Sequence, residues 1–447
     1  MSVPLIQVSG GVFRPSATVA RKRQRLARGD RRIHSSQAAG TPPSTASLRA
    51  LDWLNLLLAA LLMGFGPFAG FYLADQGWMP QNIGFVLTAS GLAGLLTQLP
   101  AGELIDVVRS KRVLVGAGAA AATLALLLLA LRPDLSSVFA AALMQGIAGS
   151  VIGPGIAAVS LGLVGHDALA GRLGRNQQYA SIGGLAAAGT MGVVGSVLPI
   201  RDIFLLTAAL GLPVVITLAR IRASDIHFGR SCGAHDRHAT HPQRVNRGAL
   251  FSDYRLLTFA ACLFLFQLAN ASVLPLVAQT LAHHETHFSS LLLSGFVVIP
   301  MMIVAILAPW VGRKAASWGR RPLLLAGLAA LPIRSALFAL CANPAPLLLV
   351  QALDGITGAT LGVLTALVIA DVTKGTGRFN LAQGFVGTCS GIGAALSTFV
   401  SGLVVASYGQ AAGFLSATAV GLLALAICWL FMPETKLATP PASAVRG

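Results

Sequence analysis

The chain has 447 residues, of which 55% are hydrophobic and only 11% are charged. Because soluble domains carry about 25% charged residues, this composition excludes an ordinary soluble protein and places the chain in a lipid bilayer. The formal net charge of +17 would indicate nucleic acid as the partner of a soluble protein, but in a membrane protein the positive residues set the topology, so we expect no nucleic-acid partner.

Residues 1–47 are rich first in arginine and then in serine, threonine and proline, with no apolar periodicity. They predict a disordered basic segment on the cytoplasmic side. Three interpretations are open: a solvated tail or over-extended gene start, a contact with anionic lipid headgroups, and an organelle transit peptide. The segment has no apolar core of the kind that a secretory signal needs.

Twelve apolar stretches follow, each near the roughly 20 residues that a helix needs to cross a bilayer. They fall near 53–74, 80–102, 112–131, 136–164, 177–198, 202–220, 256–281, 288–311, 322–341, 346–371, 380–406 and 411–432. A polar segment divides them into six and six. The sequence predicts four parts after the N-terminal segment: a six-helix bundle at 48–220, a cytoplasmic central loop at 221–254, a second bundle at 255–433 and a cytoplasmic tail at 434–447.

The basic residues gather in the N-terminal segment, the tail and the loops after even-numbered spans, whereas the other loops hold only Arg132 and Arg201. This asymmetry predicts that both ends of the chain are cytoplasmic, because Lys and Arg accumulate on that side.

The two halves of the chain resemble each other in order and at nearly one offset. The matched features are Pro67 with Pro275, Gly102 with Gly312, "GIAGSVIG" with "GITGATLG", and "LGRNQQ" with "TGRFNLAQ". Such an internal repeat predicts two related bundles about an axis along the membrane normal.

The stretch "GELIDVVRSKRVL" resembles the loop motif between spans 2 and 3 of the major facilitator superfamily. The positions that fit are Gly102, Leu104, Asp106, Lys111, Arg112 and Leu114, while Arg109 stands where the family usually has glycine. The second-half copy, "GRKAASWGRRPLL", keeps Gly312, Gly319, Arg320 and Arg321 but has Ala316 at the aspartate position.

This resemblance implies an all-α membrane protein with twelve transmembrane helices in two pseudo-symmetric six-helix bundles. It also implies a gating loop, in which Asp106 faces the start of span 11 near Asn380 when the cytoplasmic side is closed. A carboxylate is stabilised at such a helix N-terminus. With Ala316 in the second copy, we expect the latch to act chiefly through the first half.

Two elements of proton-coupled drug exporters in this superfamily are altered. Their R-x-x-Q-G element in span 4 reads Ala142, Leu143, Met144, Gln145 and Gly146 here, without the basic residue. Their G-P-x-x-G-G element in span 5 has Thr190 in place of proline. Antiport by those residues is therefore not expected, while export by other residues stays open.

Two ionisable residues, Arg334 in span 9 and Asp354 in span 10, lie well inside predicted spans. Charges within a bilayer are costly, and so are functional candidates. The two lie at similar depth and we expect them to pair, either as a staple between helices or with Asp354 handling substrate or protons. The resemblance implies that spans 1, 4, 7 and 10 line the cavity, which favours Asp354. Its partner in the repeat is Gln145.

Span 7 carries Gln267, Asn270 and Ser272 ahead of Pro275. Proline removes a backbone donor, so we expect the helix to bend or break near Asn270. Gln267 and Asn270 share one face and form either a substrate site or hydrogen bonds between helices. In span 1, Phe65 and Phe68 either flank an organic substrate or pack in the core.

Imidazole and thiolate groups occur at intervals in two loops. The central loop has Cys232, His235, His238 and His241, and the loop after span 7 contains His283, His284 and His287. Such groups suit transition metals, but neither set matches an established four-ligand pattern, so a polar loop is the favoured interpretation. The five cysteines are scattered and predict no disulfide framework.

No nucleotide-binding or hydrolytic motif is present, so neither an enzyme nor a cofactor is expected. The sequence predicts a monomeric secondary transporter of a small solute, working by alternating access in a bacterial inner membrane. We favour proton-linked export of an organic compound. The alternatives are uptake, transition-metal efflux, and a sensor that uses the same fold without transport.

Overall fold

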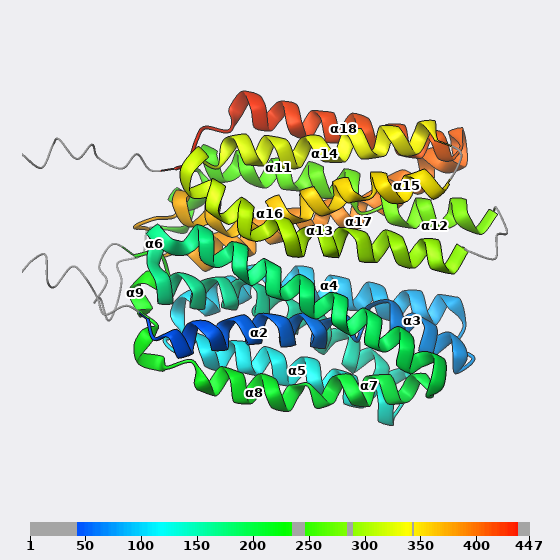
Figure 1. Ribbon diagram of the computed structural model, residues 1–447, viewed down its shortest axis with the longest axis horizontal. Helices are drawn as coiled ribbons and strands as arrows, with labels where there is room; N and C mark the ends of the chain where they lie inside the picture. The colour runs from blue at the N-terminus through cyan, green and yellow to red at the C-terminus, as the bar shows by residue number, and fades with distance from the viewer. Residues whose placement is uncertain (1–42, 235–245, 284–288, 342–343, 437–447) are drawn as a thin grey trace, which may run out of the picture. The chain divides into compact units, whose positions relative to one another are not determined.

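The computed structural model describes residues 43–234, 246–283, 289–341 and 344–436. The described residues are almost entirely helical (Figure 1). The N-terminal half contains α2 (Thr45–Met63), α3 (Gly66–Asp75), α4 (Pro80–Val107), α5 (Lys111–Leu131), α6 (Leu135–Val197), α7 (Ile200–Ala209), α8 (Gly211–Arg220), η1 (Ala223–Asp225) and α9 (Phe228–Ser231). The C-terminal half contains α10 (Arg247–Phe251), α11 (Tyr254–Asn270), α12 (Val273–His283), α13 (Ser289–Trp318), α14 (Arg321–Leu340), α15 (Pro344–Val350), α16 (Ala352–Val372), α17 (Phe379–Tyr408) and α18 (Gln410–Phe431).

Within these residues, 11 helical stretches are long and apolar enough to cross a membrane. Large apolar side chains remain exposed on their outer faces, including Leu96, Leu212, Phe399 and Trp429. Exposure of so much apolar surface is expected where lipid replaces water as the solvent.

The difference from the twelve expected spans lies in α6, which has 63 residues. A straight helix of that length would run for about 95 Å, roughly three bilayer cores. The backbone at Gly165 is not helical, with φ 69° and ψ −178°, a conformation that favours glycine. Asn176 Nδ2 lies 2.7 Å from Ser160 Oγ, although 16 residues of straight helix would separate them by about 24 Å. The chain therefore folds back at Gly165, and α6 supplies both span 4 and span 5.

One expected boundary is wrong. Span 5 was expected to begin at 177, after a polar loop, but the second arm of α6 is helical from 166 onward. The arginines of "GRLGRNQQ" therefore lie on a helix, where the contacts described below satisfy them.

Two spans are interrupted near proline. Span 7 ends as α11 at Asn270 and resumes as α12 at Val273, where the break was expected. The backbone N–H of Ser272 in the gap donates to Ser397 Oγ of α17 at 3.0 Å. Span 1 is interrupted in the same way between α2 and α3, with Pro67 in the first turn of α3.

Buried apolar side chains form two principal clusters. One draws on residues between 50 and 221, and the other on residues between 250 and 432 together with a few from α6. Helix pairs α4–α17 and α6–α13 join the two halves of the chain.

Candidate functional site

The beginnings and ends of the helices define two sides of the structure. Helix α2 begins, α4 ends, α17 begins and α18 ends on one side, which we call the terminal side (Figure 1). Hydrogen bonds there join Ser44 to Asp225, Asp106 to Asn380, and the backbone of Arg320 to Glu434.

A central cavity of about 490 Å³ lies among α2, α6, α11, α16 and α17. Its apolar wall includes Ile156, Leu173, Phe266 and Leu361. Amides and hydroxyls complete the lining, and in the described part of the chain none of the lining residues is charged: Asn55, Asn176, Gln177, Gln267, Thr365, Gln383 and Ser390 are the polar members. Such a wall suits an organic solute that carries hydrogen-bonding groups.

Among the substrate and coupling residues named from sequence, Gln267 lines this cavity. Gln145 instead reaches α2, donating from Nε2 to the Leu62 carbonyl at 3.4 Å. Phe65 is buried in the N-terminal core, in agreement with the packing interpretation. The side chain of Phe68 lies outside the described residues.

Arg334 and Asp354 form the expected ion pair. Arg334 is 2% exposed and also donates from Nη2 to Asn270 Oδ1 at 2.5 Å. The cluster thus joins spans 9 and 10 to the break in span 7. None of its three members lines the central cavity, which favours the staple over direct contact with substrate in this conformation.

Asp106 lies at the end of α4 and is fully buried against the start of α17. Its Oδ1 accepts from the Asn380 backbone N–H at 3.2 Å and from Asn380 Nδ2 at 2.8 Å, and its Oδ2 accepts from the Leu381 N–H at 2.8 Å. The first N–H groups of a helix have no partners within it, so the carboxylate supplies acceptors for α17. The structure thus places Asp106 where the family motif implied.

Glycine allows α4 and α17 to meet at this point. A Cβ on Gly102 would lie inside van der Waals contact with the Asn380 carbonyl, and one on Gly384 would meet the Gln98 carbonyl. A second crossing joins α6 to α13, where a Cβ on Gly174 would lie 2.5 Å from the Ala308 carbonyl. We call these two crossings, with Asp106, the terminal seal.

The basic residues of the gating loop have separate roles. Lys111 is buried, and its Nζ donates to the carbonyls of Ile105 and Val108 at the end of α4. A cation is stabilised there by the partial negative charge of the helix C-terminus. Arg112 donates to the Ile221 carbonyl. Arg109 is exposed, so glycine is not needed at its position.

Residues 226–234, which we call the central strap, contact both halves of the chain. On the N-terminal half, the His227 N–H donates to the Gly162 carbonyl at 3.1 Å, and Lys111 Nζ lies 4.6 Å from the Phe228 ring centroid. On the C-terminal half, the Phe379 N–H donates to the Cys232 carbonyl at 3.1 Å. Sequence reasoning missed this strap because its short polar segment has no apolar periodicity.

Cys232 is part of the strap and is fully buried. Its thiol donates to the Asp106 carbonyl at 3.2 Å. Burial raises the pKa of the Cys232 thiol, so it remains a protonated donor. No group of three His, Cys, Asp or Glu side chains that could hold a metal occurs in the described residues. His235, His238, His241, His284 and His287 lie outside them.

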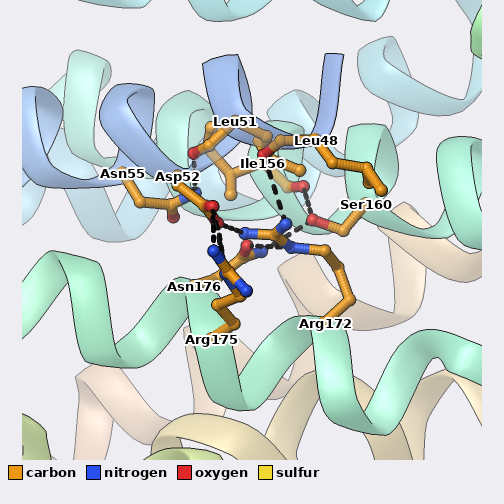
Figure 2. A network of polar contacts seen from close by, with 9 residues as sticks. All are labelled: Leu48, Leu51, Asp52, Asn55, Ile156, Ser160, Arg172, Arg175 and Asn176. Atoms are coloured by element: carbon orange, nitrogen blue, oxygen red, sulfur yellow. Dashed lines mark hydrogen bonds and ion pairs between the residues drawn. The ribbon is translucent and has the colours of Figure 1, made fainter. Parts of the chain in front are cut away.

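A buried charged network in the N-terminal half was not expected (Figure 2). Asp52 of α2 receives Arg172 and Arg175 from the second arm of α6, the latter through Nη2 at 2.8 Å. Arg172 Nε also donates to Asn176 Oδ1 at 2.7 Å, and Asn176 Nδ2 donates to Ser160 Oγ. The signal in the sequence was the pair of arginines three residues apart, which share a face only if their segment is helical.

The broken spans, the central cavity and the terminal seal define an α-helical membrane protein of the transporter class. A family model described as the Major Facilitator Superfamily matches residues 52–333 and 259–446. The chain belongs to this superfamily, whose members are transporters and not enzymes.

Two relatives in sequence have different coverage. An uncharacterized MFS-type transporter of Mycobacterium tuberculosis strain H37Rv, Rv2456c, is 37% identical over 403 residues, which cover 90% of this chain and 96% of that protein. The class B tetracycline resistance protein of Escherichia coli is 30% identical over 135 residues, covering 30% of this chain and 33% of that protein.

Two solved structures share the fold. The human organic anion transporter MFSD10 (TETRAN) matches with a TM-score of 0.67 and 15% identity, over 87% of this chain and 100% of that chain. The nucleoside transporter NupG, solved as a mutant form, matches with a TM-score of 0.61 and 16% identity over the same shares.

We predict that Asp106→Asn opens the terminal side. The asparagine amide presents a donor to the Leu381 N–H where the carboxylate presented an acceptor, and a hydrogen bond to a charged group contributes about 1.5–3 kcal/mol. Spin labels on exposed positions 109 and 374 should show a longer distance population than in the parent protein. Asp134→Asn, on an exposed loop of the opposite side, is the control, and an unchanged distance distribution in Asp106→Asn would contradict the latch.

A weakened central strap should shift the same equilibrium by a smaller amount. Gly233 has φ 75°, and its Cβ would lie 3.3 Å from Phe379 Cβ, so Gly233→Val should cost about 1–2 kcal/mol in backbone conformation. Gly77→Val is the matched control, since Gly77 has φ 78° with no atom within 4 Å. Equal label distances in the two valine variants would show that the strap does not hold the seal.

Proposed function

We propose that the protein exports an organic solute across a bacterial inner membrane by alternating access, with the terminal side in the cytoplasm. The orientation rests on the distribution of Lys and Arg. The observation that carries the solute class is the cavity wall of amides, hydroxyls and apolar groups without a charged member among the described residues. A buried uncompensated ion in such a wall would be costly, which favours a neutral molecule.

Export is favoured over uptake by the partial likeness to tetracycline resistance proteins. With the terminal side in the cytoplasm, the terminal seal would separate the cavity from the cytoplasm in the closed conformation. Solute would enter from the cytoplasm after α4 parts from α17 and the second arm of α6 parts from α13. Each ligand can shift this equilibrium only by its difference in affinity for the two states.

For coupling, we propose that Asp354 carries the proton. Its side chain is 30% exposed while that of Arg334 is 3% exposed, so the carboxylate is the more accessible member of the pair. Protonation of Asp354 would remove the negative partner of Arg334 and weaken the link to Asn270 at the break of span 7. The broken helix would then be free to move, which gives the ion pair a role in conformational change and not in solute contact.

The direct test uses everted membrane vesicles with a pH gradient that is acidic inside the vesicle. Radiolabelled tetracycline and uridine serve as probes, chosen from the names of the tetracycline resistance protein and the nucleoside transporter. Accumulation that collapses with an uncoupler and is absent in vesicles without the protein supports export. Counterflow of a labelled probe distinguishes transport from a sensor, which would bind without exchange. Failure of a wider panel of neutral compounds in both assays would overturn the proposal.

We predict that Gln267→Ala raises the KM for the transported probe by about three- to tenfold, because one hydrogen bond contributes about 0.5–1.5 kcal/mol. Gln145→Ala is the matched control, since Gln145 is also an intramembrane glutamine but does not line the cavity. Equal KM values for the two variants would show that the solute does not bind in this cavity.

Asp354→Asn should abolish accumulation driven by the pH gradient and retain counterflow of the same probe. The amide cannot ionise, so the pair with Arg334 can no longer respond to protons, while the uncharged cavity is unchanged. Asp134→Asn serves as the control for inserted, active protein. Accumulation at the parent rate would rule out Asp354 as the coupling carboxylate.

A further inference from the structure

A second cavity, of about 470 Å³, lies beside the charged network on the terminal side. It opens between the first turns of α2 and the second arm of α6, and we call it the arginine cavity. Three arginines line it, Arg49, Arg172 and Arg175, together with Asp52. It is distinct from the central cavity, with which it shares no lining residue.

The charges around the arginine cavity are unbalanced. Asp52 is the one carboxylate in the lining, and both Arg172 and Arg175 already pair with it. Its wall therefore carries two positive charges in excess. Asp167 is a neighbour of the lining residue Ala168, but its exposed side chain is not part of the wall. Arg172 is buried and paired with Asp52, whereas Arg49 and Arg175 are exposed and can meet an anion that arrives from outside the protein.

The network also fixes the arginines in place. The side chains of Arg172 and Asp52 are 5% and 4% exposed, and Arg172 donates to the Leu48 carbonyl as well as to Asp52. Figure 2 shows the two guanidiniums of α6 meeting Asp52 side by side. Arg175 is 53% exposed at the rim. A guanidinium has five donors in a fixed fork, so groups bound to Asp52 on one edge can still meet an anion on another.

Two small residues, Ala168 and Gly171, form part of the wall of the arginine cavity. Gly171 lies in its wall, and a Cβ there would meet no atom within 4 Å. Leu48 and Val164 provide an apolar part of the wall beside the arginines. Asp52 lies seven residues after Thr45, the first residue of α2, which is about 10 Å along the helix.

We propose that the arginine cavity binds a phosphate group, supplied by the headgroup of an anionic phospholipid. Arginine recognises phosphate through paired hydrogen bonds, and the excess positive charge of the wall balances the negative charge of the phosphate. The apolar part of the wall would contact the first carbons of an acyl chain, next to the glycerol. The site would hold α2 to the second arm of α6, which carries one of the two crossings of the terminal seal. Inorganic phosphate offers the same chemistry without the lipid. The inference does not depend on the proposed solute.

The test measures thermal unfolding of the purified full chain in detergent, titrated with dioleoylphosphatidylglycerol, dioleoylphosphatidylcholine or inorganic phosphate. Phosphatidylglycerol should raise the Tm at saturation well above the effect of phosphatidylcholine. A rise with inorganic phosphate alone would keep the phosphate site and assign it to a free anion. Equal effects of the two lipids, with none from inorganic phosphate, would overturn the proposal.

Variants separate charge from space. Arg49→Gln, outside the Asp52 network, should weaken the apparent affinity for phosphatidylglycerol about tenfold, as expected for loss of a charge-assisted hydrogen bond. Gly171→Leu keeps every charge and should abolish the effect by filling the cavity. Arg220→Gln is the matched control, since Arg220 is exposed at a helix end on the same side and lies outside the cavity. If Arg49→Gln bound phosphatidylglycerol with the affinity of the parent protein, the proposed site would be wrong, even if Gly171→Leu failed to fold.

Discussion

The arrangement of the two halves depends on the contact between the Asp106 carboxylate and the first turn of α17. A buried carboxylate needs donors, and the first N–H groups of a helix need acceptors, so each satisfies the other. The match is available only where the two backbones touch, and Gly102 permits this approach. When α4 and α17 separate, water can replace both sets of partners. The closed state is therefore favoured by these hydrogen bonds in addition to the apolar packing that α6 shares with the C-terminal half.

The second crossing is built differently. The corresponding acidic position in the repeat is Ala316. The α6–α13 contact includes the close approach of Gly174 and Gly312, and Gln178 Nε2 donates to the Ala305 carbonyl at 3.1 Å. Arg320 of the second motif turns to its own half and pairs with Asp371 at 2.8 Å. The carboxylate of Asp106 thus attracts the opposite half at the α4–α17 crossing only, while glycines allow close packing at both crossings. This asymmetry agrees with the loss of the aspartate in the second copy.

Much of the fold could be predicted because hydropathy, the internal repeat and the charge asymmetry all act over long stretches. The break in span 7 and the pairing of Arg334 with Asp354 followed from local rules about proline and buried charge. The Asp52 network was missed because a polar stretch with two arginines, Arg172 and Arg175, has the composition of a loop. Their charges are satisfied only by a residue from another helix. The cavity lining was largely missed for a related reason: whether Asn55 or Gln383 faces the cavity depends on the rotation of its helix, which packing decides.

The described lining of the central cavity contains no charged residue, yet each half has an ion pair that is linked to a residue in or near that lining. On the N-terminal side, Asn176 lines the cavity and accepts a hydrogen bond from Arg172. On the C-terminal side, Gln267 lines the cavity, and Asn270, three residues later on α11, accepts from Arg334. A neutral solute would therefore meet amides and not ions. In the N-terminal half one amide has both contacts: if Asn176 reorients around a solute, the hydrogen bond that it offers to Arg172 changes, so binding and charge can be coupled there without direct contact between them.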